Sequence, residues 1–245
     1  MLRLFRLIFF HLKVYVRNQY FLWLPITSTF SIFLLQYISA YAYGGLTDSN
    51  LWLRSAIFGM WTSATTATGS IGFQRRQGTL KYITNTNIGD GLSLLALILP
   101  ASIFGLISFP LSYFMAVILD LPISKINLDT IIFIMLIWLG IAVMDLLIAA
   151  FFVLTRNAIV YENLLHIPII IVTGLLGSSL TIQKISVITQ WFIPIVSPIQ
   201  WLLGNSTSFY WYAYIVSLIL WIILAFSLGK YLLNKAKENG QGGMI

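Results

Sequence analysis

The chain has 245 residues, of which 59% are hydrophobic, 15% are aromatic and only 9% are charged. That composition predicts a membrane protein and argues against a soluble enzyme. The chain contains no cysteine, which excludes disulfides, thiolate metal sites and cysteine nucleophiles.

Six stretches of the sequence are long and apolar enough to cross a membrane, which takes about 20 mostly apolar residues. They are residues 21–43, 54–72, 91–119, 129–154, 163–182 and 209–229. The polar segments between them leave no room for a soluble catalytic domain. We therefore predict an all-α polytopic membrane protein with six transmembrane helices in one transmembrane domain, residues 1–245.

The positive charges are distributed unevenly between the two sides of these spans. Eleven of the 14 Lys and Arg residues flank one side, and only Arg54, Lys125 and Lys184 lie on the other. Because Lys and Arg accumulate in cytoplasmic loops, both termini and residues 73–90 are expected in the cytoplasm of a cell bounded by this plasma membrane. This pattern also explains the net charge of +7 without nucleic acid as a partner.

Residues 1–20 are too charged to span and are predicted to form an interfacial amphipathic helix. Its cations fall within an arc of roughly 80° on a helical wheel: Arg3, Arg6, Lys13 and Arg17. The far side is apolar, with Leu4, Phe5, Ile8, Phe9, Leu12 and Val16. Such a helix lies on the inner leaflet with its cations toward anionic lipid headgroups. Simple anchoring and docking to a partner are compatible roles for it.

The second predicted span carries small and hydroxyl residues along one helical stripe: Gly59, Thr62, Ser63, Thr66 and Ser70. Small residues let helix backbones approach closely in lipid, and hydroxyls can bond across the contact. The stripe fits a helix–helix packing seam or the polar wall of a substrate path. A dimer seam would serve both purposes.

The third and fourth spans each contain one unusual feature. Pro100, Gly105 and Pro110 interrupt the third span and predict a bend. Asp145 is an ionisable residue inside the fourth hydrophobic run. Intramembrane acids normally face a bundle interior or water, so Asp145 is either a proton-coupling carboxylate or a buried structural acid.

The last part of the chain contains a broken apolar segment. Pro194 and Pro198 divide residues 183–208 into pieces too short to span, which predicts two short re-entrant helices on the outer side. We expect the polar tail after Leu228 to be frayed.

The sequence shows no pattern typical of a catalytic site. Intramembrane catalysis needs a nucleophile with a base, paired carboxylates or metal ligands. The two histidines, His11 and His166, belong to no HExxH pattern, and no phosphate-binding loop of the form GxxxxGKS or GxxxxGKT occurs. We therefore expect no catalytic residue, no metal site and no cofactor bound by this chain.

Residues 73–90 carry an Arg75-x-x-Gly78-Thr79-Leu80 core after the second span. This core resembles the coupling segment of the type-2 ATP-binding-cassette (ABC) permease family. Residues 194–199, PIVSPI, are similar to the family's proline-containing outer segment before the last span. Four positions depart from the family pattern, with non-acidic residues where acids are usual or Asn where Pro is common: Gln74, Arg76, Lys81 and Asn87.

The resemblance implies the membrane subunit of an ATP-driven exporter. Such permeases pair as homodimers or heterodimers, and each docks a separate cytosolic ABC ATPase subunit that binds ATP and Mg. Segment 73–90 would then be a coupling helix, in which an apolar knob with a charged rim suits docking of a helix into a groove. The expected docking residues are Arg75, Arg76, Gly78, Thr79, Leu80, Lys81 and Ile83. The alternative is that these cations only obey the positive-inside rule.

Three functions are compatible with this sequence. The first is export of a hydrophobic or amphipathic compound, such as a peptide antibiotic, a drug or a lipid-linked molecule, as the resemblance implies for a bacterial membrane. The second is secondary transport or conduction in which Asp145 carries protons. The third is a membrane immunity or assembly factor that sequesters a peptide without transporting it.

Overall fold

The structure is a computed structural model that describes residues 2–43, 48–76, 78, 90–155, 158–176 and 180–238. Within these ranges, all regular secondary structure is helical. The elements in chain order are α1 (Leu2–Val16), α2 (Gln19–Ala42), α3 (Leu51–Arg76), α5 (Asp90–Phe104), the 3₁₀ turn η1 (Gly105–Ile107), α6 (Ser108–Ile118), α7 (Leu128–Leu154), α8 (Ala158–Val172), α9 (Leu180–Thr189), α10 (Val196–Leu202) and α11 (Trp211–Glu238).

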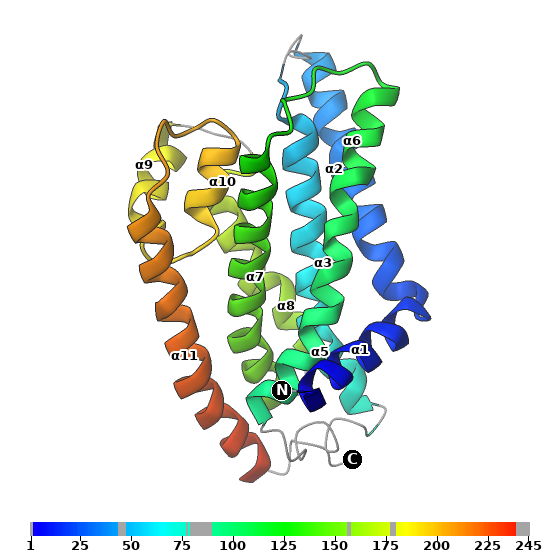
Figure 1. Ribbon diagram of the computed structural model, residues 1–245, viewed down its shortest axis with the longest axis vertical. Coiled ribbons are helices and arrows are strands. Elements are labelled where there is room, and N and C mark those ends of the chain that lie inside the picture. Colours follow the sequence, from blue (N-terminus) through cyan, green and yellow to red (C-terminus); the bar gives the residue numbers. More distant parts are fainter. Residues whose placement is uncertain are drawn as a thin grey trace.

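The long helices form an elongated bundle. Helices α2, α3, α7 and α11 and the α5–α6 pair run along its long axis (Figure 1). Helix α1 crosses the bundle at the end where the last turns of α11 also lie, and we call this end the base (Figure 1). The N-terminus and the end of α11 therefore lie on the same side of the molecule. An even number of membrane crossings between them would have this result.

Four helical segments are long and apolar enough to cross a membrane: Gln19–Ala42, Gly91–Ile118, Leu128–Leu154 and Trp211–Lys235. They confirm the coarse expectation of an all-helical protein with membrane-spanning character. The remaining two predicted spans fall on α3, which is long but rich in hydroxyl residues, and on α8, which is short. The six-span topology therefore stays a prediction.

Helix α3 forms the centre of the bundle. It packs against α2, α5, α6, α7 and α8, and most of its side chains are buried. Buried side chains form two core clusters. One lies around Trp52 and Ile137, in the part of the bundle away from the base, and the other lies near the base, around Ile71 and Phe152. Both clusters include α3 and α7. A helix of only moderate apolarity can occupy this position because its neighbours shield it from lipid.

Helix α8 differs from the predicted span at 163–182. It ends at Val172 after 15 residues, a length of about 22 Å, and turn residues 173–176 follow. Gly174 adopts φ +71°, the left-handed conformation that commonly ends helices. Gln200 of α10 donates from Nε2 to the Thr173 carbonyl oxygen at 2.6 Å. This bond gives a partner to one of the carbonyl groups at the C-terminal end of α8.

The bend expected in the third span is a short 3₁₀ turn, η1, between α5 and α6. Gly105 starts this turn, and a Cβ there would lie 2.9 Å from Cα of Met60 on α3. The glycine therefore allows the backbones of η1 and α3 to touch. The two prolines remain inside helices, Pro100 in α5 and Pro110 in α6.

Two short helices, α9 and α10, occupy the segment 183–208, as the prolines predicted, although α9 starts earlier, at Leu180. Their re-entrant placement in a membrane stays a prediction. The expectation of a frayed tail after Leu228 is wrong for residues 229–238, because α11 continues to Glu238, and residues 239–245 lie outside the described residues. Good helix formers follow Leu228, and Leu233 is buried in the core cluster at the base.

Gly59 lies where α3 meets both α2 and α6. A Cβ on this residue would lie 1.8 Å from Oγ1 of Thr29 and 2.5 Å from Oγ of Ser108. Neither neighbour can retreat freely, because Thr29 and Ser108 are themselves completely buried. The three helices therefore approach this closely only because residue 59 lacks a side chain.

We expect Gly59→Ala to lower the free energy of unfolding by about 1–3 kcal/mol, the usual cost of overpacking a core. Gly229→Ala is the matched control, because a Cβ there would make an ordinary 3.6 Å contact with Cβ of Ala150. That variant should be neutral or slightly stabilising, since Ala favours helix by about 1 kcal/mol over Gly. Denaturant unfolding in one detergent compares the two, and Thr29→Ala should partly rescue Gly59→Ala. Equal effects of the two glycine variants would contradict this account.

Candidate functional site

Helix α1 presents three faces at the base. Its buried face packs on α5 and α2 and includes His11 and Tyr15. The four predicted surface cations, Arg3, Arg6, Lys13 and Arg17, are all exposed. The apolar side expected from the helical wheel is divided, because Leu4, Ile8 and Leu12 are partly covered whereas Phe5 and Phe9 remain 67% and 68% exposed. Exposed aromatic rings beside cations are typical of a helix at a membrane surface.

The buried face of α1 carries two titratable side chains without charge. Burial lowers the pKa of His11, which favours its neutral form. Burial also raises the pKa of Tyr15, whose hydroxyl lies beside Ser70 of α3. The Tyr15 ring packs against Phe21 of α2 with ring centroids 4.2 Å apart. The contact thus attaches α1 to the bundle by neutral, mostly aromatic packing, and leaves the cations free to face lipid.

The stripe on α3 is directed into contacts within this chain. Gly59 touches α2 and α6, as described above, and Ser63 donates to the Ala101 carbonyl oxygen of α5 at 2.9 Å. The hydroxyls of Thr62, Thr66 and Ser70 donate to carbonyl oxygens of α3 itself, at 2.9, 2.8 and 2.6 Å. The expectation that hydroxyls bond across the contact therefore applies to Ser63, whereas Thr62, Thr66 and Ser70 donate to carbonyl oxygens of their own helix.

Asp145 of α7 is 1% exposed. It lies on the side of α7 that also buries Ile141, Ala149 and Phe152 within the bundle. An acid at this depth belongs to the protein interior and not to the lipid-facing surface, as expected for intramembrane carboxylates. Its burial agrees with both interpretations, the proton-coupling carboxylate and the structural acid.

Arg75, one of the predicted docking residues, binds the C-terminal end of α7. Its guanidinium donates to the carbonyl oxygens of Phe152, at 3.1 Å, and of Val153 and Thr155. The last carbonyl groups of a helix lack partners inside the helix and carry partial negative charge. A cationic fork of donors is therefore well matched to this position. We call this contact the Arg75 clamp.

The Arg75 clamp lies directly before the predicted coupling segment. Arg76 ends α3, and Gly78 follows in a turn with φ +68° and its N–H bonded to the Arg75 carbonyl oxygen at 3.0 Å. Among the described residues, nothing lies within 4 Å of a Cβ built on Gly78. Gly78 is therefore needed for its backbone conformation and not for close packing. Thr79, Leu80, Lys81 and Ile83 lie outside the described residues.

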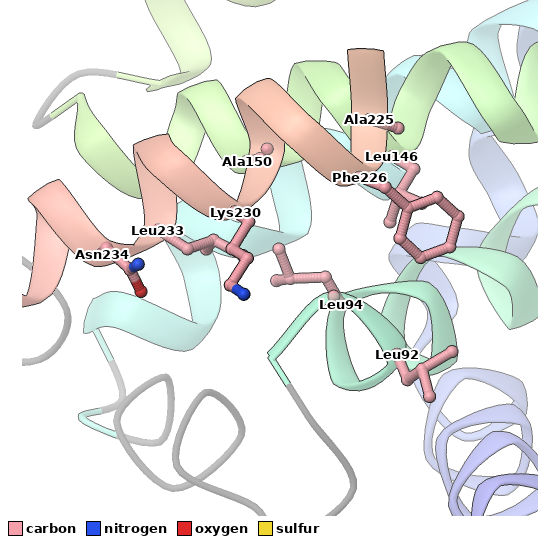
Figure 2. Close-up of a pocket in the computed structure, with 11 residues that line it drawn as sticks. Leu92, Leu94, Leu146, Ala150, Ala225, Phe226, Lys230, Leu233 and Asn234 are labelled. Atoms are coloured by element: carbon pink, nitrogen blue, oxygen red, sulfur yellow. The ribbon is translucent and has the colours of Figure 1, made fainter. Parts of the chain in front are cut away.

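A groove runs along one side of α7 between α5 and α11, and we call it the α5–α7–α11 groove. It consists of two adjoining cavities that share Leu146, Ala225 and Phe226. The cavity nearer the middle of the bundle has a volume of about 230 Å³ and includes Trp138. The cavity at the base has a volume of about 380 Å³ and includes Lys230 and Asn234. Figure 2 shows the Lys230 side chain extending from α11 toward Leu94 on α5.

Comparison with known protein families, with curated proteins and with solved structures found no match to this chain. Within the described ranges, no group of three or more His, Asp or Glu side chains is arranged to hold a metal ion.

Two features of this site were missed in the sequence. The Arg75 clamp joins residues about 80 positions apart, and a single sequence gives no signal for such a pair. The α5–α7–α11 groove is formed by three helices, so their relative positions must be known before it can be recognised. The one signal in the sequence was Lys230, a cation at the end of an apolar run.

We expect Arg75→Gln to lower the free energy of unfolding by about 1–3 kcal/mol, because the α7 carbonyl groups lose a charged donor at a helix C-terminus. Arg76→Gln is the control, since it removes an equal charge from the neighbouring position. Arg75→Lys should be intermediate, because an ammonium keeps the charge but not the planar fork. Thermal unfolding in the same detergent measures all three. Equal destabilisation by Arg75→Gln and Arg76→Gln would contradict the assigned role.

Proposed function

We propose that this chain is the membrane permease subunit of an ATP-driven exporter of the ABC type. It would work with a second permease, identical or related, and with cytosolic ABC ATPase subunits that bind ATP and Mg. The cargo would be a hydrophobic or amphipathic compound, such as a peptide antibiotic, a drug or a lipid-linked molecule. The chain itself would catalyse no reaction.

One observation carries the proposal: segment 77–89, which directly follows Arg75 and Arg76 and contains Lys81 and the Gly-Thr-Leu core, connects α3 to α5 where both helices reach the base. Helix α3 leads into it at Arg76, and α5 leads out of it at Asp90. Helix α1 and the last turns of α11 lie at the same end (Figure 1). This end carries most of the positive charge of the chain, which is the expected feature of a cytoplasmic surface.

The Arg75 clamp adds a mechanical argument. A partner that binds segment 77–89 would act on α3 directly through the chain. It would also act on α7, because the guanidinium of Arg75 holds the last carbonyl groups of that helix. Both core clusters include α3 and α7, so a displacement at the base would be transmitted into the middle of the bundle as the movement of packed helices.

We expect Leu80→Asp to abolish co-purification of a P-loop ATPase while the chain still inserts and folds, because the change places a charge on the proposed apolar knob. The measurement is a mild-detergent pull-down of the tagged protein from its native cell, followed by mass spectrometry. Leu80→Met keeps an apolar side chain of similar size and serves as the control. Recovery of the intact protein without any ATPase, or unchanged recovery of one with Leu80→Asp, would contradict the proposed docking.

A proton-coupled transporter is the second candidate, because the burial of Asp145 inside a spanning helix is compatible with it. A carboxylate that is 1% exposed within a spanning helix could take up and release a proton as the helices rearrange around it.

We expect Asp145→Asn to keep full ATP-dependent transport if the exporter proposal is correct. The amide has nearly the same shape as the carboxyl group, and an ATP-driven cycle needs no proton transfer at this position. Proton-coupled transport would instead be lost with this variant. Uptake or efflux in inside-out vesicles, energised either by ATP or by a pH gradient, separates the two functions. Loss of ATP-dependent transport in a well-folded Asp145→Asn protein would show that the carboxylate has a transport role after all.

A further inference from the structure

The α5–α7–α11 groove becomes more polar toward the base. In the cavity nearer the middle of the bundle, the side chains that line it are hydrocarbon except for the indole of Trp138. In the cavity at the base, Lys230 and Asn234 join the lining. A groove of this kind matches a molecule with a long apolar part and a negatively charged end.

The length of the groove matches one leaflet of a membrane. Trp138 and Ala150 mark its two ends along α7, and twelve helical residues span about 18 Å. Half of a hydrocarbon core of about 30 Å is about 15 Å. A single acyl chain that starts at the headgroup level near Lys230 would therefore reach the middle of the bilayer beside Trp138.

The charge at the base selects the occupant. Lys230 is exposed and directed across the groove toward α5 (Figure 2), and in the part of the chain that the structure describes no carboxylate forms a salt bridge with it. Lys235 on the same helix has a different environment, because its ammonium lies 5.8 Å from the Tyr231 ring. Lys230 is thus the cation available to a ligand in the groove.

A second copy of this chain is a poorer occupant of the same groove. A twofold axis along the membrane normal would place equivalent residues at equal depth. The Lys230 side chains of the two copies would then lie at equal depth on facing surfaces, and repulsion between these like charges would oppose the contact.

We propose that the α5–α7–α11 groove binds an acyl chain of an anionic phospholipid from the leaflet at the base, with the lipid phosphate against Lys230. The two cavities are only partly enclosed, so lipid would enter laterally. The inference depends on membrane insertion of the four apolar helices and does not depend on the proposed exporter function.

The test uses fluorescence of Trp138, which lines the inner part of the groove. The full chain is reconstituted into phosphatidylcholine vesicles that contain an increasing mole fraction of a lipid with brominated acyl chains, either phosphatidylglycerol or phosphatidylcholine. Bromine quenches nearby indoles, and subtraction of the Trp138→Phe protein isolates the signal of Trp138. We expect half-maximal quenching at an about five-fold lower fraction of the anionic lipid, the effect of one Lys near a membrane surface.

Lys230→Gln should abolish this preference, whereas Lys235→Gln, on the same helix, should retain it. Ala142→Leu, which fills the wall of the groove, should reduce quenching of Trp138 by both brominated lipids. Equal quenching by the two lipids in the unaltered protein, or an unchanged preference in Lys230→Gln, would overturn the proposal. Because Lys230 is exposed, its substitution tests the idea even if Ala142→Leu does not fold.

A cross-linking arm examines the competing occupant. The chain has no cysteine, so Leu99→Cys in the wall of the groove introduces a unique thiol. A lipid-filled groove should leave this thiol monomeric after mild oxidation in native membranes. Efficient formation of a disulfide dimer would overturn the lipid assignment in favour of a second copy.

Discussion

The packing of α3 is the constraint on which the other contacts depend. This helix carries seven Ser and Thr residues between Ser55 and Ser70, and hydroxyl groups facing hydrocarbon would need partners that lipid tails do not offer. The structure satisfies most of them with carbonyl oxygens of α3 itself. The surface of the helix is therefore formed by small side chains whose hydroxyl groups already have partners. Other helices can surround it at short range, and close packing replaces the hydrophobic driving force that is missing inside a membrane.

The Arg75 clamp extends this arrangement to the base. Without it, the α7 carbonyl groups that it reaches would be left with unfavourable partial charge at the junction with α3. Arg75 is also the first residue of the motif on which the resemblance to ABC permeases depends. The same side chain therefore has a structural partner inside the chain, and the residues that follow it remain the better candidates for contact with an ATPase. In the proposed permease, structural and docking roles would thus be distributed over adjacent positions.

Hydropathy was sufficient to locate α2, α7, α11 and the α5–α6 pair, since each of these segments is long and apolar enough to cross a membrane. It was less successful for α3, which begins at Leu51 instead of Arg54 and continues past residue 72 through the polar residues Gln74, Arg75 and Arg76. It misplaced the end of α8, because that end is fixed by a left-handed glycine and by Gln200, which comes from a helix later in the chain. At the site, the exposed cations of α1 followed from the wheel, whereas the clamp and the groove arise from residues distant in sequence.

The attachment of α11 has a consequence for how the protein unfolds. This helix packs chiefly against α7, with smaller contacts to α5 and α10. The groove lies between α5 and the part of α11 from Ile222 to Asn234. A spanning helix keeps its backbone hydrogen bonds when it leaves its neighbours, so separation costs only packing. Separation of α11 would therefore break one extensive interface, that with α7, and would leave the helices around α3 in contact with one another. Local opening at α11 would then cost less free energy than loss of the packing around α3.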